Sequence, residues 1–542
     1  MRLLINGKQL RDAFISGANN LCNRKAEVDA LNVFPVPDGD TGTNMSMTIG
    51  NGAKELEKLG DDVTVEEVAK VAASGFLRGA RGNSGVILSL LFRGFSKGMK
   101  GKETATGADI AAAFSLGVEA AYKAVMKPTE GTILTVSRCA AEKATEIVKY
   151  DDSTVAVLYG MYLQSKRTLA QTPEMLPILK KSGVVDAGGQ GLVYIFEGMW
   201  SVISEGKIIM PKTAEETSSK ASDYLYCVEA VAKRGENASE GFEKVLSAFG
   251  EIVEYTEGTQ GAKFHIHTNE PGKVITEALA FGTLLATKVE NMSVAHTELE
   301  FEYEAPAEEA KEEKFAYAEV DPSIEYGFVS VCAGKGLTDV FADLGCDNIV
   351  SGGQTMNPST EDILAAVQAT PAKNVFVLPN NKNIVMAAVQ AAEIADRNVI
   401  VIPSKTVPQG ISAMLTFDGE ASVKENTEAM NEALSAVTTG QVTFAARDSD
   451  FDGHKIKEGE LLAMKEGKMI YTGKEMDLIC SRLAKALVTK ETSMVTIYYG
   501  EDVTEEQAEE IRSVIEAKLP GSIEVNTIYG GQPVYYYIIS AE

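Results

Sequence analysis

The chain has 542 residues and a formal net charge of −26 at pH 7. This length predicts several domains, and 45% hydrophobic with 24% charged residues predict that most of the chain folds. The negative charge argues against nucleic acid as a partner, because phosphate backbones are neutralised by Lys and Arg. It also argues against stable adhesion to anionic membranes.

Neither a signal peptide nor a membrane span is predicted. The opening MRLLINGKQLRDAF lacks the long apolar core of a signal peptide, and no run reaches the length of a transmembrane helix. The six cysteines have neither a CxxC motif nor the spacing of a disulfide framework. We therefore expect reduced cysteines in a cytoplasmic protein.

Residues 1–205 are predicted to form an all-α domain. Thr64 and Glu67 have the spacing of a capping box, and apolar residues follow at helical spacing as far as Phe76. A second stretch with the same period begins at Ile110. Glycine-rich breaks that carry hydroxyl and carboxylate groups separate the helices at 79–85, 130–132 and 186–191. This pattern is typical of a helical barrel with a site at one end.

Residues 32–45, NVFPVPDGDTGTNM, are the most informative segment. Pro35 and Pro37 fix φ and lack N–H donors, so an ordinary helix is not expected here. The carboxylates of Asp38 and Asp40 are hard oxygen donors that suit Mg²⁺ shared with phosphate. A polar turn is the alternative, because Asp-Gly is common in turns. The density of ligand atoms favours a metal–phosphate site.

A second candidate phosphate loop is RGNSG. Arg81, Gly82, Asn83 and Ser84 precede an apolar helical run, so backbone N–H groups and a helix dipole could meet an anion. A plain helix–helix loop is the alternative. The chain has neither a Walker A motif nor the HRD and DFG motifs of protein kinases, so a nucleotide site here would use Mg²⁺ held by Asp.

A polar linker at 211–220 precedes a small α+β domain, residues 221–297. Its best strand is AKFHIHT, where the period of two puts His265 and His267 on one face. With Cys227 on another short strand, these side chains could bind Zn²⁺. The alternative is two half-buried histidines and a core cysteine.

An acidic linker is predicted for residues 298–322, because like charges repel and little apolar surface is present. From 323 to 542 short apolar strands alternate with amphipathic helices, which indicates an α/β domain with a parallel sheet. The last part adds a hairpin, a helix, and strands at SMVTIYYG and QPVYYYIIS.

The segment GGQTMNPSTEDIL, residues 352–364, follows a strand and opens a helix. It loosely resembles the Thr-Ser-x-Pro-Ser loop of DegV-like lipid-binding proteins, with Thr355 and Ser359 kept and Met356 in place of the second hydroxyl. We expect a strand-to-helix turn capped by Ser359 or Thr360 rather than a fatty acid site.

The first domain resembles the nucleotide-binding domain of the dihydroxyacetone kinase family in four segments: NVFPVPDGDTGTNM, GARGNSGVILS, EGTILTV and VVDAGGQGL. Within that family the resemblance is to the fatty acid kinase A subunit of Gram-positive bacteria. Over the remainder it rests on domain order, HIHTNEPG and the closing YGGQPVYYY.

The resemblance implies an antiparallel eight-helix barrel that binds ATP or ADP with two Mg²⁺ ions. Asp38 and Asp40 would hold the metals, and Asp186 with Gly188 would line the nucleoside side. A third carboxylate of the dihydroxyacetone branch has Asn32 as its nearest counterpart, so the third ligand is the Asn32 carbonyl, water or phosphate. The residues implied to contact phosphates are Thr41, Thr43, Asn44, Asn83, Ser84 and Thr132.

The implied activity is phosphorylation of a fatty acid carboxylate, presented by a separate DegV-like carrier protein, to give acyl-phosphate for phospholipid synthesis. The resemblance also implies a homodimer, Zn²⁺ in the middle domain, and docking of the carrier on the C-terminal domain. Two alternatives stay open: a dihydroxyacetone-type kinase component, and a regulatory protein that retains nucleotide without transferring phosphate.

Overall fold

The computed structural model divides into two compact units, Met1–Ile209 with Lys311–Glu542, and Met210–Ala310. Within the described residues, no helix combines the length and apolar character needed to cross a lipid bilayer. The structure describes residues 4–33, 39–125, 127–212, 224–235, 242–257, 261–291, 315–353, 356–445, 449–451, 454–457 and 459–542.

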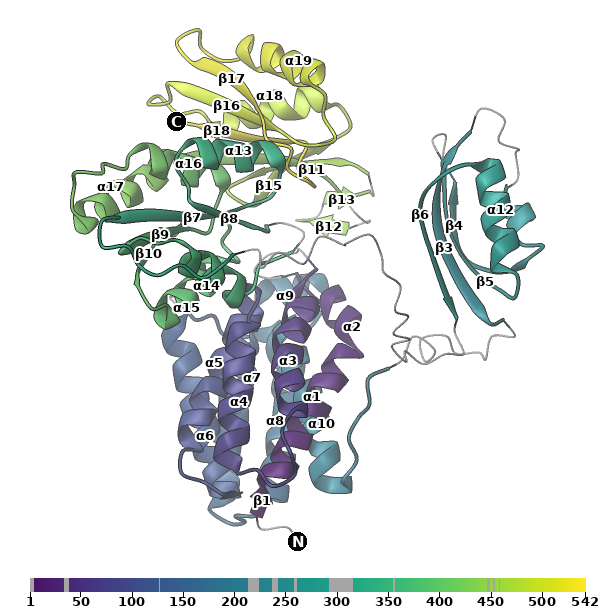
Figure 1. The fold of residues 1–542 in the computed structure, drawn as a ribbon, viewed down its shortest axis with the longest axis vertical. Coiled ribbons are helices and arrows are strands. Elements are labelled where there is room, and N and C mark those ends of the chain that lie inside the picture. Colours follow the sequence, from purple (N-terminus) through teal and green to yellow (C-terminus); the bar gives the residue numbers. More distant parts are fainter. Residues whose placement is uncertain are drawn as a thin grey trace. The chain divides into compact units, whose positions relative to one another are not determined.

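The first part of the larger unit is helical, as predicted (Figure 1). Two short strands, β1 (Leu4–Asn6) and β2 (Thr104–Thr106), pair antiparallel at one end. From α2 to α9 each helix packs against the next, α1 packs against α3, and α10 packs against α1 and α8. The helices are α1 (Gly7–Cys22), α2 (Lys25–Ala30), α3 (Thr41–Glu57), α4 (Val65–Arg78), α5 (Gly82–Gly98), α6 (Gly107–Ala124), α7 (Ile133–Val148), α8 (Thr154–Met175), α9 (Pro177–Ser182) and α10 (Ala187–Glu205).

Long helices of this part alternate in direction (Figure 1). The N-terminal ends of α4 and α6 lie beside β2, where the Val65 N–H donates to the Glu103 carbonyl (3.1 Å) and the Gly107 N–H to the Asp152 carbonyl (3.1 Å). The capping box that Thr64 and Glu67 form confirms the predicted start of α4. Because direction alternates, the N-termini of α3, α5, α7 and α10 lie at the opposite end.

Close helix packing depends on glycine. A Cβ atom on Gly94 of α5 would lie 2.5 Å from the Leu116 carbonyl oxygen of α6, and one on Gly198 of α10 would lie 2.5 Å from the Ser16 carbonyl oxygen of α1. Edge-to-face aromatic rings fill the space inside, with centroids of Phe76 and Phe92 5.0 Å apart. Small residues at the crossings and rings between them give a dense interior.

The C-terminal part of the larger unit begins with a parallel sheet in the order β10-β9-β7-β8, which confirms the predicted α/β pattern. Val375 and Val377 face the α14 and α15 side, whereas Phe376 and Leu378 face the opposite side. Both faces are therefore covered. The elements are β7 (Tyr326–Cys332), α13 (Lys335–Asp343), β8 (Asn348–Ser351), α14 (Thr360–Ala369), β9 (Asn374–Leu378), α15 (Val385–Ile394), β10 (Asn398–Val401), α16 (Val407–Leu415) and α17 (Val423–Ala436).

A second, six-stranded sheet has the order β15-β14-β11-β18-β16-β17, and only β16 and β17 pair parallel in it. The two remaining short strands form a separate antiparallel pair. The elements are β11 (Thr438–Phe444), β12 (Ser449–Phe451), β13 (His454–Ile456), β14 (Leu461–Lys465), β15 (Lys468–Gly473), α18 (Met476–Leu487), β16 (Met494–Tyr499), α19 (Glu505–Glu516), β17 (Glu524–Tyr529) and β18 (Tyr537–Ala541).

The closing YGGQPVYYY segment differs from its prediction. A strand was expected from Gln532 onward, but β18 begins at Tyr537. Val534 has a φ of +72°, which is incompatible with extended strand backbone. Tyr535 and Tyr537 are buried, so these two side chains belong to the core.

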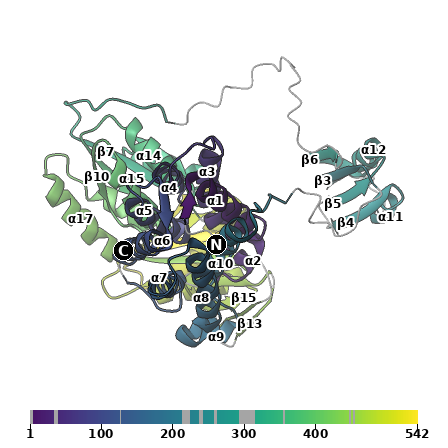
Figure 2. The ribbon, with the colours of Figure 1, turned by 90° about the horizontal axis from the view of Figure 1, so that it is seen from below.

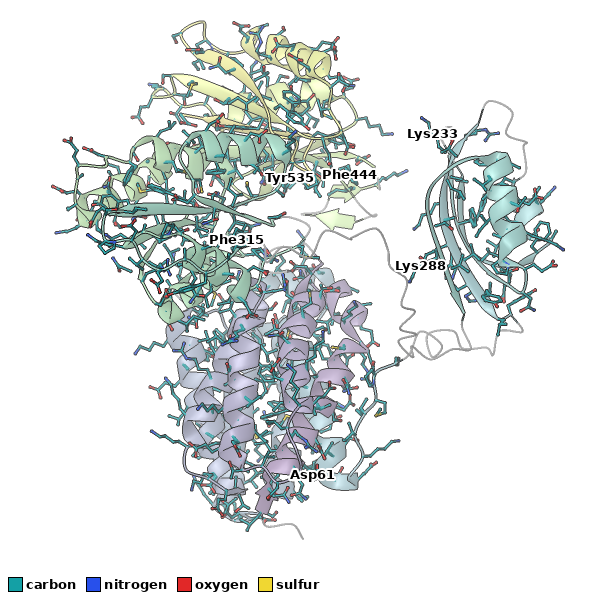
Figure 3. The ribbon with its side chains drawn as sticks, viewed as in Figure 1. Asp61, Lys233, Lys288, Phe315, Phe444 and Tyr535 are labelled. Carbon is teal, nitrogen blue, oxygen red and sulfur yellow. The ribbon has the colours of Figure 1, made fainter. Side chains whose placement is uncertain are left out.

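The helical and α/β parts share one hydrophobic core. Helix α15 packs against α5, and α14 against α4, within a single cluster of buried side chains. Phe315 packs on the edge of this cluster at the junction (Figure 3). Residues 315–322, expected at the end of an acidic linker, lie along the α/β part, where the Ala318 N–H donates to the Gln368 carbonyl (2.9 Å).

The smaller unit is an antiparallel sheet in the order β4-β5-β3-β6, with α11 and α12 on one face (Figures 1 and 2). Phe242 and Phe281 stack with their ring centroids 4.3 Å apart beneath these helices. The predicted linker residues 213–220 and 298–314 lie outside the described residues. The elements are β3 (Tyr226–Arg234), α11 (Phe242–Leu246), β4 (Gly250–Glu257), β5 (Gly261–Thr268), α12 (Pro271–Phe281) and β6 (Gly282–Asn291).

The glycine crossings generate a prediction about stability. Gly94→Ala should lower the free energy of unfolding by about 1–3 kcal/mol, because the new methyl group meets rigid backbone. Gly50→Ala is the matched control, since Gly50 is also helical and has no atom within 4 Å of an added Cβ. That control should be neutral or stabilising by up to about 1 kcal/mol, as Ala favours helix more than Gly. Urea denaturation followed by circular dichroism measures both, and equal effects would contradict the packing argument.

Candidate functional site

Four helix N-termini converge at the end of the helical part that faces the α/β part. Each begins directly after a residue that the sequence singled out: Asp40 before α3, Arg81 before α5, Thr132 before α7 and Asp186 before α10. A helix N-terminus presents unpaired N–H groups and a partial positive charge. The arrangement is therefore suited to an anion with several phosphate groups.

The N-terminus of α3 carries most of the DGDTGTN motif. Thr41, Thr43 and Asn44 form the first helical turn, so the expectation that the motif is non-helical was wrong beyond Asp40. The φ of +68° at Gly39 redirects the chain into the helix. Asn32, which precedes the motif in the sequence, is buried, with 1% of its surface exposed. Asp38 lies outside the described residues.

Asp29 is a residue of this site that sequence reasoning missed. Its carboxylate accepts hydrogen bonds from the Thr43 N–H (2.9 Å) and the Thr43 hydroxyl (2.8 Å). A Cβ atom on Gly42 would come within 3.0 Å of Asp29 Oδ1, so glycine is needed for this approach. No helical or strand period relates positions 29 and 43, and the sequence therefore held no signal for the pair.

The N-terminus of α5 lies against α3. Gly82 has a φ of +57°, and a Cβ atom there would lie 2.6 Å from the Asn44 amide nitrogen. Asn83 and Ser84, expected in a loop, lie in the first turn of α5. The Asn83 amide also donates to Asn383 Oδ1 of the α/β part (3.3 Å). The GTN and RGNSG motifs are therefore in contact.

Asp186 links the N-termini of α7 and α10. It caps α10 by accepting the Gly189 N–H (2.7 Å), and it also accepts the Ile133 N–H at the start of α7. A Cβ atom on Gly188 would lie 3.2 Å from the Ile133 side chain. Thr132 donates its hydroxyl to the Thr129 carbonyl (2.7 Å). Burial raises the pKa of Asp186 to about 7, against the opposing effect of these N–H groups.

The α/β part also reaches this end of the helices. Asn357 donates from its side-chain amide to Asp40 Oδ2 (2.8 Å), and its carbonyl accepts from Arg81 Nη1 (2.7 Å). Ser359 caps α14 in a capping box with Asp362, which confirms the predicted strand-to-helix turn. Sequence reasoning singled out this loop but not Asn357, because its partner is 317 residues away.

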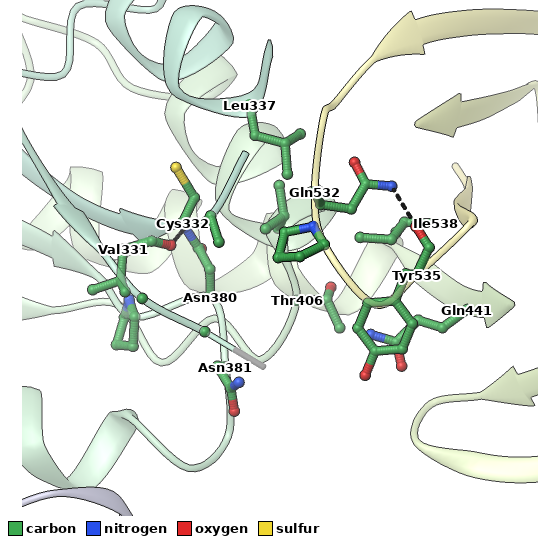
Figure 4. A pocket seen from close by; sticks show the side chains of 16 residues that line it. Val331, Cys332, Leu337, Asn380, Asn381, Thr406, Gln441, Gln532, Tyr535 and Ile538 are labelled. Atoms are coloured by element: carbon green, nitrogen blue, oxygen red, sulfur yellow. Dashed lines mark hydrogen bonds between the residues drawn. The ribbon is translucent and has the colours of Figure 1, made fainter. Parts of the chain in front are cut away.

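A small cavity lies at the carboxyl ends of β7 and β9, where the strand order of the parallel sheet reverses (Figure 4). Asn380, Thr406 and Gln532 are among its polar lining residues. As bounded by the described residues, the cavity measures about 40 Å³. Ligand pockets measure about 300–1,000 Å³. An acyl chain does not fit.

The smaller unit brings Cys227, His265 and His267 together, as predicted. One ligand atom from each lies within 4.8 Å of the others, and the Cys227 sulfur is 3.1 Å from His265 Nε2. Cys227 and His267 are cross-strand partners on β3 and β5, and His265 is on the same face of β5. Partial burial, with the neighbouring His265, lowers the pKa of His267. A neutral imidazole is the form that binds a metal.

Comparison with known proteins shows the family. Three family models match: the DAK2 domain over residues 35–201, the fatty acid kinase A-like (FakA-like) middle domain over 223–299, and the FakA-like C-terminal domain over 327–542. Protein YloV of Bacillus subtilis is 40% identical over 99% of both chains. The chain belongs to the fatty acid kinase A-like family, a family with kinase domains, which confirms the resemblance.

Two solved structures show weaker likeness. A DegV family protein from Corynebacterium glutamicum is 16% identical, with a TM-score of 0.32 over 40% of this chain and 97% of that chain. The dihydroxyacetone kinase of C. freundii with AMP-PNP and Mg²⁺ is 17% identical, with a TM-score of 0.29 over 35% of this chain and 33% of that chain. Neither likeness is strong enough to carry an argument about function.

The buried carboxyl of Asp186 generates a prediction about pH. Because its pKa rises from 3.8 to about 7 on folding, the folded chain binds more protons between these values, and stability falls as pH rises. The slope is at most about 1.4 kcal/mol per pH unit. Asp186→Asn keeps an acceptor without the charge. The Tm of this variant, minus that of the wild type, should therefore increase from pH 5 to pH 7.

Asp109→Asn is the control for this experiment. Asp109 lies at the opposite end of the helices, partly desolvated but hydrogen-bonded by Lys102 and Thr106, and its pKa is lowered. The stability that Asp109 contributes is lost only as pH falls below the pKa of this carboxyl in the unfolded chain. The Tm of Asp109→Asn, minus that of the wild type, should therefore stay constant from pH 5 to pH 7. Calorimetry without nucleotide measures both Tm differences. A Tm difference that does not change with pH for Asp186→Asn would refute the raised pKa of Asp186.

Proposed function

We propose that the chain transfers the γ-phosphoryl group of ATP to the carboxylate of a fatty acid, which a separate carrier protein presents. The observation that carries this proposal is the convergence of Asp40 with four helix N-termini, in a chain of the fatty acid kinase A-like family. The product is acyl-phosphate. The site uses positioning and charge neutralisation, which phosphoryl transfer mainly requires.

The proposed nucleotide and metal roles are those that the family resemblance implies. Asp40, with Asp38, would hold two Mg²⁺ ions, because carboxylates are the hard ligands that such ions take beside phosphate oxygens. Asp186 and Gly188 would line the nucleoside side. Bound Mg²⁺ would neutralise charge on the phosphates. The phosphate contacts would come from Thr41, Thr43, Asn44, Asn83, Ser84 and Thr132, all in the first helical turn or directly before it.

A carboxylate acceptor suits the residues of the helical domain. A fatty acid is ionised near pH 7, because the pKa of a carboxylic acid lies well below that value. Its oxygen is therefore a nucleophile without a general base, whereas a hydroxyl acceptor more often needs one. Residues 1–205 contain no histidine, and the chain's four histidines are His265, His267, His296 and His454.

The fatty acid would arrive on a DegV-like carrier protein. Supporting this, the cavity of the chain's own α/β domain, about 40 Å³, has no room for an acyl chain. We propose an eight-helix barrel over residues 1–205, built from α1, α3–α8 and α10. The middle domain would span 221–297, and an acidic linker would follow from 298 as far as 314, since residues 315–322 lie along the α/β part. The α/β domain, 323–542, would dock the carrier, and the chain would act as a homodimer.

We also propose that Cys227, His265 and His267 bind Zn²⁺ in the middle domain. A thiolate and two imidazoles form a three-residue ligand set for zinc, with a fourth position left for water or a carboxylate. Their proximity, within 4.8 Å across adjacent strands, supports the proposal.

The test of the proposed reaction is to trap its product. With ATP, Mg²⁺ and a lipid-loaded carrier, hydroxylamine should convert acyl-phosphate into a hydroxamate. Asp40→Asn should lower this yield by at least about 100-fold, since a direct ligand should matter more than a residue that only hydrogen-bonds a ligand, whose loss costs about 10–100-fold. Asp61→Asn is the control, because Asp61 is an exposed aspartate at the far end of the helices (Figure 3). The Asp61 side chain is 65% exposed, and its ion pairs with Lys8 and Arg11 lie away from the candidate site.

Three outcomes of this experiment separate the alternatives. Hydroxamate from the fatty acid supports the proposal. Phosphorylation of dihydroxyacetone, measured by ADP release when it replaces the lipid-loaded carrier, would instead indicate the dihydroxyacetone-type kinase. Stable nucleotide binding without a phosphorylated product, for every carrier tried, would indicate a regulatory protein. Wild-type turnover by Asp40→Asn would contradict the metal assignment.

The zinc site predicts a metal content that can be measured directly. Purified protein should contain about one Zn²⁺ per chain by elemental analysis, a ratio set by one three-ligand cluster. His265→Ala should remove most of it, because two protein ligands remain. His454→Ala, a histidine elsewhere in the chain, should leave the zinc content unchanged. Equal zinc content in all three proteins would refute the site.

A further inference from the structure

The loop before α14 is anchored to the helical domain at two neighbouring points. The Thr360 N–H donates to the Ala80 carbonyl (3.0 Å), and Arg81 Nη1 donates to the Asn357 carbonyl (2.7 Å). A longer ion pair joins Arg81 to Asp362 (3.5 Å). This loop therefore lies over the residues that lead into α5, beside the N-terminus of α3.

The side chain of Asn357 faces the candidate metal ligand. Its Nδ2 donates to Asp40 Oδ2 at 2.8 Å, and a Cβ atom on Gly82 would lie 3.5 Å from the same nitrogen. Asn357 is 3% exposed, and among the described residues its Oδ1 is a buried acceptor without a hydrogen-bond partner. A buried acceptor left unpaired costs about 1–3 kcal/mol, which indicates that a further group completes this site.

We propose that Asn357, from the C-terminal domain, is a positioning residue of the nucleotide site: its amide N–H holds Asp40 in the orientation that binds Mg²⁺, and its buried acceptor Oδ1 is paired with a donor group only when the site is occupied. This inference rests on the proposed function only for the identity of the ligand. It assigns the C-terminal domain a part in the phosphate site, in addition to the proposed docking of the carrier.

The side chain that contacts Asp40 is a neutral amide rather than a cation, and this difference matters for metal binding. Lys or Arg at this position would neutralise Asp40 and compete with Mg²⁺ for the carboxylate. An amide donor orients the carboxylate without neutralising its charge. Partners of this kind, which hydrogen-bond a metal ligand from behind, commonly fix its geometry.

Domain docking alone does not require this contact. The same two domains are also joined by Arg93 of α5, which donates to Glu393 Oε2 (2.7 Å) and Gln390 Oε1 (3.2 Å) on α15, and by the shared hydrophobic core. Those contacts can hold the domains together without a buried amide opposite Asp40. Because binding free energies are reciprocal, Mg²⁺–nucleotide bound at Asp40 should in turn strengthen the docking of the Asn357 loop.

The test measures Mg²⁺-dependent ADP binding to the full-length chain by calorimetry, with no acceptor or carrier present. Asn357→Ala should weaken ADP binding about 10–100-fold in Mg²⁺, the usual cost of losing a residue that orients a metal ligand, and leave binding in EDTA unchanged. Asn357→Leu keeps a similar side-chain size and should weaken Mg²⁺-dependent ADP binding as much as Asn357→Ala does. It provides the test if the alanine variant does not fold.

Two control variants separate positioning from docking. Met356→Ala changes the adjacent residue, which is 59% exposed, and Arg93→Ala breaks the interdomain ion pair on α15. Both should keep the wild-type Mg²⁺ dependence. Hydrogen exchange gives a second readout: Mg²⁺–ADP should slow exchange of the Thr360 amide in the wild type and in both controls, but not in Asn357→Ala.

The outcomes are distinct from those of the kinase test. Wild-type Mg²⁺-dependent affinity in both Asn357 variants would overturn the inference, and so would equal weakening by Arg93→Ala, which would assign the effect to docking. If the Asn357 variants lose affinity while the wild type forms no acyl-phosphate, the inference stands and the proposed reaction fails. If acyl-phosphate forms and the Asn357 variants bind ADP with wild-type Mg²⁺ dependence, the proposed reaction stands and the inference about Asn357 fails.

Discussion

The alternating direction of the helices is the constraint on which the candidate site depends. It places the N-termini of α3, α5, α7 and α10 at one end, although Asp40 and Asp186 are far apart in the chain. Glycines at the crossings, such as Gly94 against α6 and Gly198 against α1, allow the helices to approach closely enough. Aligned N–H groups at one end then form a preorganised environment for anionic phosphate.

The carboxylates at this end have different structural roles. Asp186 is buried between two helix N-termini, and Asp29 holds both the N–H and the hydroxyl of Thr43. Asp40 is only half-buried and meets a neutral amide from another domain. Among the described carboxylates at this end, Asp186 and Asp29 therefore pair with N–H and hydroxyl groups of the helical frame, whereas Asp40 contacts an amide of the C-terminal domain.

The C-terminal domain shares its hydrophobic core with the helical domain, and this shared core determines which of its residues reach the candidate site. Its parallel sheet is covered on one face by α14 and α15, which also pack against α4 and α5. Asn357, which follows β8, is thereby brought to the end of the helices at which α3 and α5 begin. The cavity at the reversal point of the same sheet measures about 40 Å³ within the described residues, and Asn357 of the loop contacts both Arg81 and Asp40.

The sequence by itself determined the local elements and the chemistry of the motifs. Capping residues such as Thr64 and Ser359 marked the helix starts. The alternation of short apolar strands with amphipathic helices indicated the parallel sheet, and four short motifs indicated the family. These signals are local, because caps and periodicity act over a few residues. Segments rich in glycine were misjudged as loops: α3, α5 and α10 begin within them, since close packing rather than helix propensity chose glycine there.

Only the tertiary structure decided which distant residues meet. The contacts of Asp29 with Thr43, of Asp186 with the start of α7, and of Asn357 with Asp40 have no spacing or period that a sequence reveals. They arise because helices pack in alternating directions and because two domains bury a common hydrophobic face. The identity of the ligand atoms is thus a property of the sequence, and their assembly into one site is a property of the packing.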